Sequence, residues 1–219
     1  MGQPDTTTKK TAVNRPARPA VFLDRDGTIN EQMGYINHIS RFQLLPGVGE
    51  AIRILNEHYL PVVVVTNQSG LARGYFPESL LDEVHQEMTF MLAQEGAHID
   101  GLYVCPHHPE AKEERFRVDC KCRKPKTGLL EQAANDLSID LRRSFVVGDR
   151  WSDLRCGAAV GATTILVLTG YGRGDAAYIG PGQVVQPDYI AEDLGAAVRW
   201  ILVGDEEEEA GDEDKGDIY

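Results

Sequence analysis

Two carboxylates stand one residue apart at the end of an apolar run, in the segment VFLDRDGTIN that begins at Val21. In an extended backbone the side chains of residues i and i+2 point to the same side, so Asp24 and Asp26 are expected to lie close together. Two such carboxylates repel, and one of them tends to keep its proton unless another group stabilises both charges. The pair therefore indicates a bound metal ion, a division of labour between an acid and a base, or a turn that both aspartates merely cap.

Three other polar segments could complete such a site. The sequence TNQSG begins at Thr66 after the run PVVVV, Lys124 follows a cysteine-rich segment, and GDRWSD begins at Gly148 after another apolar run. A continuous β-branched run is typical of a parallel strand that is buried on both faces. We therefore expect TNQSG and GDRWSD to follow strands, and Lys124 to lie on a loop.

The elements around these segments alternate along the chain. Strands are expected at about 20–24, 61–65, 101–104, 145–148 and 163–168 and near Tyr189, and helices at about 47–58, 77–95, 128–137, 152–160 and 191–203. This alternation with short connections predicts an α/β fold, a doubly wound, Rossmann-like parallel sheet with helices on both faces. Ligands bind at the carboxyl ends of the strands in such sheets. Asp24, Asp26, Thr66 and Asp149 are therefore predicted to meet at one edge of the sheet.

Length and charge indicate how the chain is organised. It has 219 residues, 42% hydrophobic content and a net charge of -12, which suits one core of ordinary size. Residues 205–219 contain nine acidic residues and one lysine, so we predict an acidic, disordered tail. Residues 1–19 are predicted to form a disordered arm, and residues 20–204 a single domain.

The same features exclude several classes of partner. The chain between its two ends is still acidic, which argues against a nucleic-acid ligand. No stretch approaches the roughly 18 uninterrupted apolar residues of a membrane span, and the N-terminal arm lacks the apolar core of a signal peptide. We therefore expect a soluble, cytoplasmic monomer that acts on a small molecule and has no membrane partner.

A charged loop at about residues 105–124 holds two close pairs of soft or borderline metal ligands, Cys105 with His107 and Cys120 with Cys122. Clustered thiols in a reducing compartment favour a metal over a disulfide. Four nitrogen and sulfur ligands suit a closed, tetrahedral Zn²⁺ site with a structural role. The neighbouring histidine His108 is an alternative fourth ligand, and a set of reduced thiols and unconnected histidines is the alternative to any metal site.

Together, DRDGT, TNQSG, a later lysine and GDRWSD resemble the motifs of the haloacid dehalogenase superfamily of aspartate-nucleophile phosphatases. The resemblance runs from about residue 20 to about residue 200. It rests on the motifs occurring in order, since each one alone arises by chance. It implies that Asp24 attacks phosphorus, that Asp26 exchanges protons with the leaving oxygen and with water, and that Thr66 and Lys124 bind the phosphoryl oxygens.

The same resemblance implies a catalytic Mg²⁺ held by Asp24, Asp149 and the main-chain carbonyl of Asp26, with Asp153 as a candidate supporting residue. Mg²⁺ takes about six oxygen ligands and usually retains waters, so a few protein oxygens suffice. Structural explanations stay open for these residues, because aspartate and threonine also cap turns and helices and a lone lysine usually lies at the surface.

The cysteine-rich loop followed at once by CRKPKTG narrows the resemblance to the D-glycero-D-manno-heptose-1,7-bisphosphate 7-phosphatases, a capless group that acts in lipopolysaccharide precursor synthesis. It implies that Arg123 recognises the second phosphate, for which a guanidinium fork is suited, and that Arg150 stands where that group usually carries a lysine. The other substrate-binding residues that it implies are Gln32, Met33, Gly34, Tyr35, Thr66, Asn67, Gln68, Ser69 and Lys124.

Alternatives to this function remain open in the sequence. The segment that begins at Gln32 keeps Gly-Tyr but lacks the acidic-histidine pair that precedes it in the heptose group, so histidinol phosphate or another small phosphomonoester is an alternative substrate. A 3′-phosphate on nucleic acid is disfavoured by the acidic charge. An inactive, zinc-stabilised binding module is disfavoured because such a module need not keep both Asp24 and Asp26.

Overall fold

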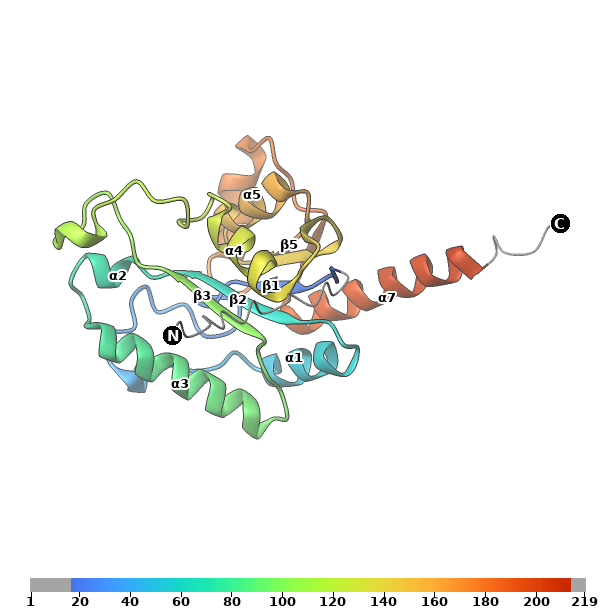
Figure 1. Cartoon of the computed structure of the whole chain (residues 1–219), viewed down its shortest axis with the longest axis horizontal. Coiled ribbons are helices and arrows are strands. Elements are labelled where there is room, and N and C mark those ends of the chain that lie inside the picture. The colour runs from blue at the N-terminus through green and yellow to red at the C-terminus, as the bar shows by residue number, and fades with distance from the viewer. Residues whose placement is uncertain (1–16, 214–219) are drawn as a thin grey trace, which may run out of the picture.

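A parallel sheet of six strands forms the centre of the molecule (Figure 1). The computed structural model describes the backbone of residues 17–213 and the side chains of residues 17–203. The strands are β1 (Val21–Leu23), β2 (Val62–Asn67), β3 (Gly101–Cys105), β4 (Phe145–Gly148), β5 (Thr163–Val167) and β6 (Tyr189–Ala191). Their order across the sheet is β3-β2-β1-β4-β5-β6, so the chain winds first to one side of β1 and then to the other. The predicted doubly wound α/β fold is confirmed.

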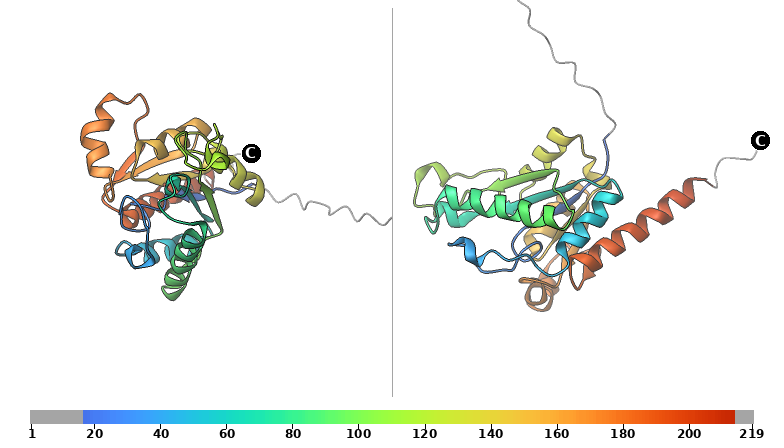
Figure 2. Two further views of the ribbon diagram at one scale, coloured as in Figure 1. Left: turned by 90° about the vertical axis from the view of Figure 1, so that its left-hand side faces the viewer. Right: turned by 90° about the horizontal axis from the view of Figure 1, so that it is seen from below.

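Alternate side chains of each strand supply the cores on the two faces of the sheet. Val21 and Leu23 pack into one core, whereas Phe22 between them packs into the other. The first core is covered by the helices α1 (Val48–Glu57), α3 (Glu78–Gln94) and α7 (Leu194–Glu213), and the second chiefly by α4 (Gly128–Leu137) and α5 (Trp151–Val160). Figure 2 shows helices on both sides of the sheet. The buried β-branched run at β2 thus behaves as its composition predicted.

Short helices complete the described chain, and sequence periodicity did not predict them. They are α2 (Ser69–Ala72) and α6 (Gly172–Gly174), a π-helical turn at Asp175–Ile179, and 3-10 turns at Ile39–Arg41, Glu114–Phe116, Leu141–Arg143 and Gly180–Gly182. One turn of helix is too short to show a hydrophobic period. No separate cap domain interrupts the sheet within residues 17–213.

The structure at the two ends of the described chain can be compared with the predicted domain limits. Arg18 pairs with the chain after α4, since its N–H donates to Ser138 and its carbonyl accepts from Asp140. Residues 1–16 and 214–219 lie outside the description. The last helix begins at Leu194 and continues as backbone helix to Glu213, beyond the predicted end at Val203; glutamate has a high helix propensity. The division into arm, domain and tail stays a prediction.

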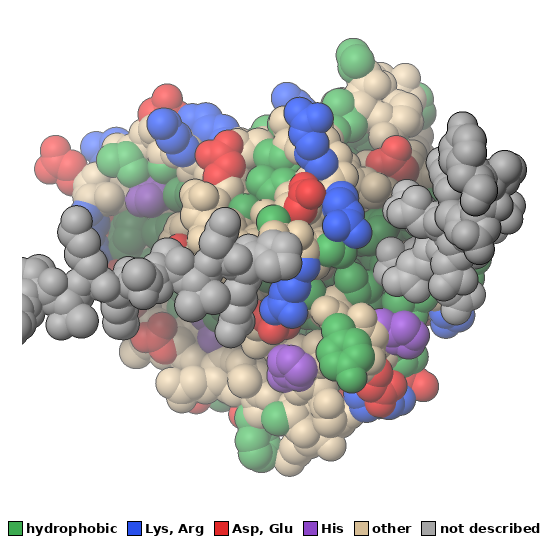
Figure 3. All heavy atoms as spheres, turned by 45° about the vertical axis from the view of Figure 1, so that its right-hand side comes forward, with side chains coloured by type: hydrophobic (Ala, Val, Ile, Leu, Met, Phe, Trp, Pro, Cys, Tyr) green, Lys and Arg blue, Asp and Glu red, His purple; other side chains and the backbone are tan. Residues whose placement is uncertain are grey.

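Charge is mixed on the molecular face drawn in Figure 3, where Lys and Arg side chains alternate with Asp and Glu side chains. That face therefore presents no continuous basic surface among its described residues. Among the described residues, no helix combines the length and apolar character that crossing a bilayer requires.

Candidate active site

Three carboxylates meet at the carboxyl ends of the two central strands. Asp24 follows β1, while Asp149 and Asp153 come from the end of β4 and the first turn of α5. Their carboxylate oxygens all lie within 4.8 Å of one another, and all three residues are buried. One oxygen of Asp149 accepts from the Tyr171 N–H at 2.8 Å, whereas the other is buried without a hydrogen-bond partner among the described residues. Such a set of crowded oxygens fits a divalent cation, because the cation supplies the missing positive charge.

Burial perturbs these carboxylates strongly. It raises the pKa of Asp24 to about 6, an effect that Lys124 opposes and Asp153 reinforces. It raises the pKa of Asp149 to about 8, with further increases from Asp24 and Asp153. Buried like charges disfavour the ionised forms in this way, so the protein stabilises the ionised set only with added positive charge.

Two glycines let the backbone close around Asp149. A Cβ at Gly27 would lie 2.1 Å from the Asp149 carboxylate, and one at Gly170 would lie 2.2 Å from it. Both residues have positive φ, +94° and +53°, which side chains rarely adopt. The acidic cluster therefore requires a residue without a side chain at position 27, directly after the two aspartates of DRDGT.

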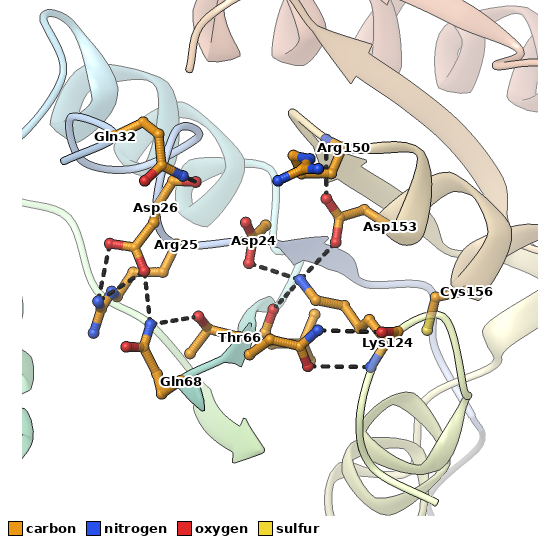
Figure 4. Close-up of polar contacts among 12 residues, drawn as sticks. Asp24, Arg25, Asp26, Gln32, Thr66, Gln68, Lys124, Arg150, Asp153 and Cys156 are labelled. Atoms are coloured by element: carbon orange, nitrogen blue, oxygen red, sulfur yellow. Dashed lines mark hydrogen bonds and ion pairs between the residues drawn. The ribbon is translucent and has the colours of Figure 1, made fainter. Parts of the chain in front are cut away.

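The Lys124 amino group joins the acidic cluster from the opposite loop (Figure 4). It lies 2.6 Å from an oxygen of Asp24 and 2.6 Å from an oxygen of Asp153, and it donates to the Val65 carbonyl at 2.8 Å. The Asn67 amide holds the Lys124 backbone at both its N–H and its carbonyl. Burial opposes the charge, but the two aspartates raise the pKa of Lys124, so the lysine is a fixed cation beside Asp24.

Asp26 is held apart from Asp24 by a network of donors (Figure 4). One terminal nitrogen of Arg25 lies 2.9 and 2.8 Å from its two oxygens, and the Gln68 amide donates to it at 2.6 Å. Asn30 adds a third donor at 3.0 Å. Burial alone would raise the pKa of Asp26, but the Arg25 charge and these hydrogen bonds lower it.

The network extends on both sides of Asp26. The Gln68 amide also donates to the Thr66 hydroxyl at 2.9 Å; because that hydroxyl oxygen is an acceptor here, its own hydrogen remains available to another acceptor. On the other side, Arg25 lies 3.1 Å from Nε2 of His85, a residue of α3. Burial and the Arg25 charge lower the pKa of His85 to about 4, so the neutral imidazole can accept from Arg25.

A cavity of about 420 Å³ opens over Asp24 and Asp26. The predicted site residues that line it are Asp24, Asp26, Gln32, Gly34, Tyr35, Thr66, Asn67, Gln68, Ser69, Arg123, Lys124, Arg150 and Asp153. Met33 does not line it, because its side chain packs against the core beneath α1 and α3. Gln32 donates to the Asp26 carbonyl at 3.2 Å, and Arg150 lies over the Tyr171 ring and 3.4 Å from Asp175.

The four predicted zinc ligands form a second cluster on the loop between β3 and α4. Nδ1 of His107 and the sulfur atoms of Cys105, Cys120 and Cys122 all lie within 4.8 Å of one another. The sulfur atom of Cys105 lies 3.6 Å from that of Cys120 and 3.0 Å from that of Cys122. Tetrahedral zinc with Zn–S bonds of about 2.3 Å separates its sulfur ligands by about 3.8 Å. The distance between Cys105 and Cys120 is close to this value and that between Cys105 and Cys122 is shorter, so the four residues fit zinc by their chemistry and by their common clustering. His108 lies outside the cluster and contacts Arg73 instead.

Comparison with known proteins places this geometry in a family. Residues 121–197 match the HAD-hydrolase-like family model. A D-glycero-beta-D-manno-heptose-1,7-bisphosphate 7-phosphatase of Photorhabdus laumondii is 47% identical over 154 residues, which are 69% of this chain and 81% of the relative. The protein of the same name from Haemophilus influenzae is 45% identical over 168 residues, which are 73% of this chain and 90% of the relative.

The chain belongs to the D-glycero-beta-D-manno-heptose-1,7-bisphosphate 7-phosphatase family. A solved structure supports this placement: the D,D-heptose 1.7-bisphosphate phosphatase of B. bronchiseptica, complexed with magnesium and phosphate, superimposes with a TM-score of 0.76 at 35% identity. The match covers 85% of this chain and 99% of that one. As a member of the heptose-bisphosphate 7-phosphatase family, the chain is a phosphoric monoester hydrolase, and the predicted relation to the haloacid dehalogenase phosphatases is confirmed.

The sequence did not predict several residues of this phosphatase site. Arg25 holds Asp26, His85 contacts Arg25, and Tyr171 contributes a backbone N–H to Asp149. A charged residue at the end of a buried strand was a usable signal for Arg25, whose side chain is only 2% exposed. No local pattern marks His85 or Tyr171, because each reaches the site from a distant element.

Proposed function

We propose that the chain is a Mg²⁺-dependent phosphatase that removes the 7-phosphate of D-glycero-D-manno-heptose 1,7-bisphosphate through an aspartyl-phosphate at Asp24. The observation that carries this proposal is the position of Asp24 at the cavity floor, between Lys124 and the buried oxygens of Asp149 and Asp153. The names of the family members supply the substrate. Lipopolysaccharide precursor synthesis is the pathway that the resemblance of the sequence implies.

In the first step, an oxygen of Asp24 forms a bond to phosphorus as the bond from phosphorus to the sugar oxygen breaks. Asp26 gives a proton to that leaving oxygen. Its contacts with Arg25, Asn30 and Gln68 lower its pKa, so Asp26 takes up this proton as it leaves those contacts. The Lys124 amino group and the Thr66 hydroxyl donate to the phosphoryl oxygens, which carry the developing charge. Asp26 must leave part of its contact with Arg25 and Gln68 to reach the substrate.

In the second step, a water attacks the phosphorus of the aspartyl-phosphate. Asp26 takes a proton from this water, the bond between phosphorus and Asp24 breaks, and inorganic phosphate leaves. Asp26 is thereby protonated again and ready for the next substrate.

The metal ligands in this proposal are Asp24, Asp149 and the carbonyl of Asp26, with Asp153 in support. When bound, Mg²⁺ neutralises the crowded carboxylates and the phosphoryl charge. The Zn²⁺ in the proposal is structural: Cys105, His107, Cys120 and Cys122 use all four positions of a tetrahedral site, and the zinc would order a loop that contains little apolar material.

The nucleophile is tested with Asp24→Asn, which keeps the size of the side chain. We expect a loss of turnover of at least about 10³-fold with an unchanged melting temperature, because the amide is a very poor nucleophile. Incubation of the wild-type protein with substrate and rapid acid quench should give a phosphoryl mass adduct on the peptide that contains Asp24. Substantial activity of the asparagine variant would remove Asp24 from this role.

The substrate is tested by measuring phosphate release from heptose 1,7-bisphosphate, histidinol phosphate and a 3′-phosphorylated oligonucleotide with Mg²⁺. We expect the highest kcat/KM for the bisphosphate. A higher value for histidinol phosphate would replace the heptose with the alternative substrate, and no turnover of any of them would favour a binding module.

A further inference from the structure

Arg73, directly after α2, lines the same cavity as Asp24 and Lys124 but has little compensation within the protein. Its side chain is only 31% exposed, and its Nε is buried without a hydrogen-bond partner among the described residues. The one carboxylate near it, that of Glu110, lies 3.6 Å away and is 77% exposed. A partly buried guanidinium is poorly compensated when its Nε has no acceptor and its carboxylate partner is exposed to solvent, which makes Arg73 a candidate to bind an anion in the cavity.

The closest contact of Arg73 does not provide a satisfactory acceptor. A terminal nitrogen of Arg73 lies 2.8 Å from Nε2 of His108, while the N–H of Glu110 donates to Nδ1 of the same ring at 3.0 Å. Arginine and the backbone N–H are donors only, and a neutral imidazole has a single acceptor nitrogen. His108 therefore cannot accept from both groups at once, and an anion in the cavity would supply what is missing.

A second guanidinium lines the same cavity. Arg123 donates to the His107 carbonyl at 3.3 Å, and His107 precedes the His108 whose ring Arg73 contacts. Two guanidinium groups that line one cavity favour an anion as its occupant. The cation of Lys124, by contrast, is already matched by Asp24 and Asp153. The uncompensated positive charge of the cavity thus lies with Arg73 and Arg123.

We propose that Arg73 is a specificity-determining residue that binds the non-reacting phosphate of a bisphosphate substrate together with Arg123. This inference rests on the proposed function, in which the reacting phosphate occupies Asp24, Thr66 and Lys124. A dianionic phosphate has enough acceptor oxygens for both guanidinium groups, which bind phosphate in a bidentate manner. Substrate occupancy would also draw Arg73 away from the unsatisfied contact with His108.

The test compares heptose 1,7-bisphosphate with the same sugar that carries only the 7-phosphate. For Arg73→Gln we expect kcat/KM to fall about 10- to 100-fold on the bisphosphate, mainly through KM, because one or two charged hydrogen bonds are lost. The value for the monophosphate should stay within about twofold of the wild type. Arg73→Lys, which keeps the charge and loses the fork, should fall between the two on the bisphosphate.

Two matched variants separate binding from loop support. Glu110→Gln removes the ion pair with Arg73 but leaves the guanidinium in the cavity, and Arg115→Gln removes a cation that pairs with Glu78 and Glu113 elsewhere on the loop. Both should turn over the two substrates as the wild type does. Equal losses on both substrates for Arg73→Gln, or the same pattern for Glu110→Gln, would overturn the inference in favour of a structural arginine.

Melting temperature and zinc content serve as fold controls. If Arg73→Gln does not fold, Arg73→Lys tests the inference instead. A loss of kcat/KM confined to the bisphosphate supports the inference, and equal losses on both substrates overturn it. A wild-type protein that shows no preference for the bisphosphate contradicts the proposed substrate itself. If the variants of Arg73 keep the wild-type preference for the bisphosphate, only the role of Arg73 is contradicted and the proposed substrate stands.

Discussion

The contact between Arg25 and Asp26 is the one to test first at the scale of single residues. Arg25 is almost fully buried and touches both oxygens of Asp26 and the ring of His85. In the proposed reaction the acid must be close to the leaving oxygen in both steps, and a carboxylate without this support would adopt other rotamers. We therefore regard Arg25 as a positioning residue.

Arg25→Gln should lower kcat by about 10- to 100-fold with little change in KM, since it affects proton transfer rather than substrate binding. It should also lower the free energy of unfolding by about 3 kcal/mol, because a charge of Asp26 is left without its partner. Steady-state kinetics and thermal melts measure both. The matched control is Arg53→Gln, which removes an exposed arginine paired with Glu57. A changed KM with an unchanged kcat would contradict the positioning role.

The raised pKa values of Asp24, about 6, and Asp149, about 8, predict how metal-free protein responds to pH. The pKa of both carboxyl groups is higher in the folded protein than in the unfolded chain, where it is 3.8. Stability is therefore greatest below pH 4, as far as these groups are concerned, and falls as the pH rises from about 4 to 8. Chemical denaturation in EDTA at several pH values measures this fall.

Mg²⁺ should reverse the trend, because the ion binds the ionised carboxylates and competes with protons. Its apparent affinity is expected to rise by up to about tenfold per pH unit below pH 8. Titration of the melting temperature with MgCl₂ at pH 6 and pH 8 measures this rise. An affinity independent of pH would show that these aspartates are not the ligands.

At the scale of elements, the loop that carries Cys105, His107, Cys120 and Cys122 connects the proposed zinc site with the cavity. It bears the proposed zinc site, and it leads directly into Arg123 and Lys124. Its backbone also meets α2, since the Lys112 N–H donates to the Ala72 carbonyl beside Arg73. Loss of the metal should therefore affect several cavity residues together.

Cys122→Ser should reduce the zinc content from one per chain towards zero and lower the melting temperature by several degrees, since a site of this kind contributes folding free energy. The KM should rise while Asp24 stays competent. Metal analysis, melts and kinetics measure the three effects. Cys156→Ser is the control, because Cys156 is buried, donates to the Lys126 carbonyl and does not belong to the cluster of four ligands. Full zinc content in the Cys122 variant would contradict the site.

The elements that the sequence predicted well are those with a clear pattern. The β-branched run at β2 and the apolar positions of α1 identified their elements, and the rule that ligands bind where strands end brought Asp24, Thr66 and Asp149 together. Met33 was assigned to the substrate site because the segment from Gln32 to Tyr35 occupies the position of the family's substrate loop, but its side chain packs against the core. A loop has no periodicity that fixes which side chains face inward. Contacts between distant elements, such as Arg25 with His85, also leave no local pattern.

At the scale of the whole molecule, the described core contacts of the last helix lie before the acidic end of the chain. Among the described residues, the side chains of α7 that pack in or against the first core are Leu194, Ala196, Ala197, Val198, Trp200, Ile201 and Leu202. All of them precede residue 204. The tail and the sheet can therefore be separated experimentally.

Deletion of residues 205–219 should leave kcat/KM unchanged and shift the melting temperature by no more than about 3 °C, because every core contact among the described residues is kept. Limited proteolysis of the full chain should likewise end near residue 204, and gel filtration should give a monomer. A large loss of stability on deletion would show that the predicted domain boundary is wrong.

The packing of Gly27 and Gly170 around Asp149 limits how this phosphatase can be redesigned. Any side chain at either position collides with the carboxylate, whereas Gly174 and Gly182 have open space around them and ordinary backbone angles. A combinatorial library for altered sugar preference should therefore hold the two crowded glycines constant and place its diversity along the rim of the cavity.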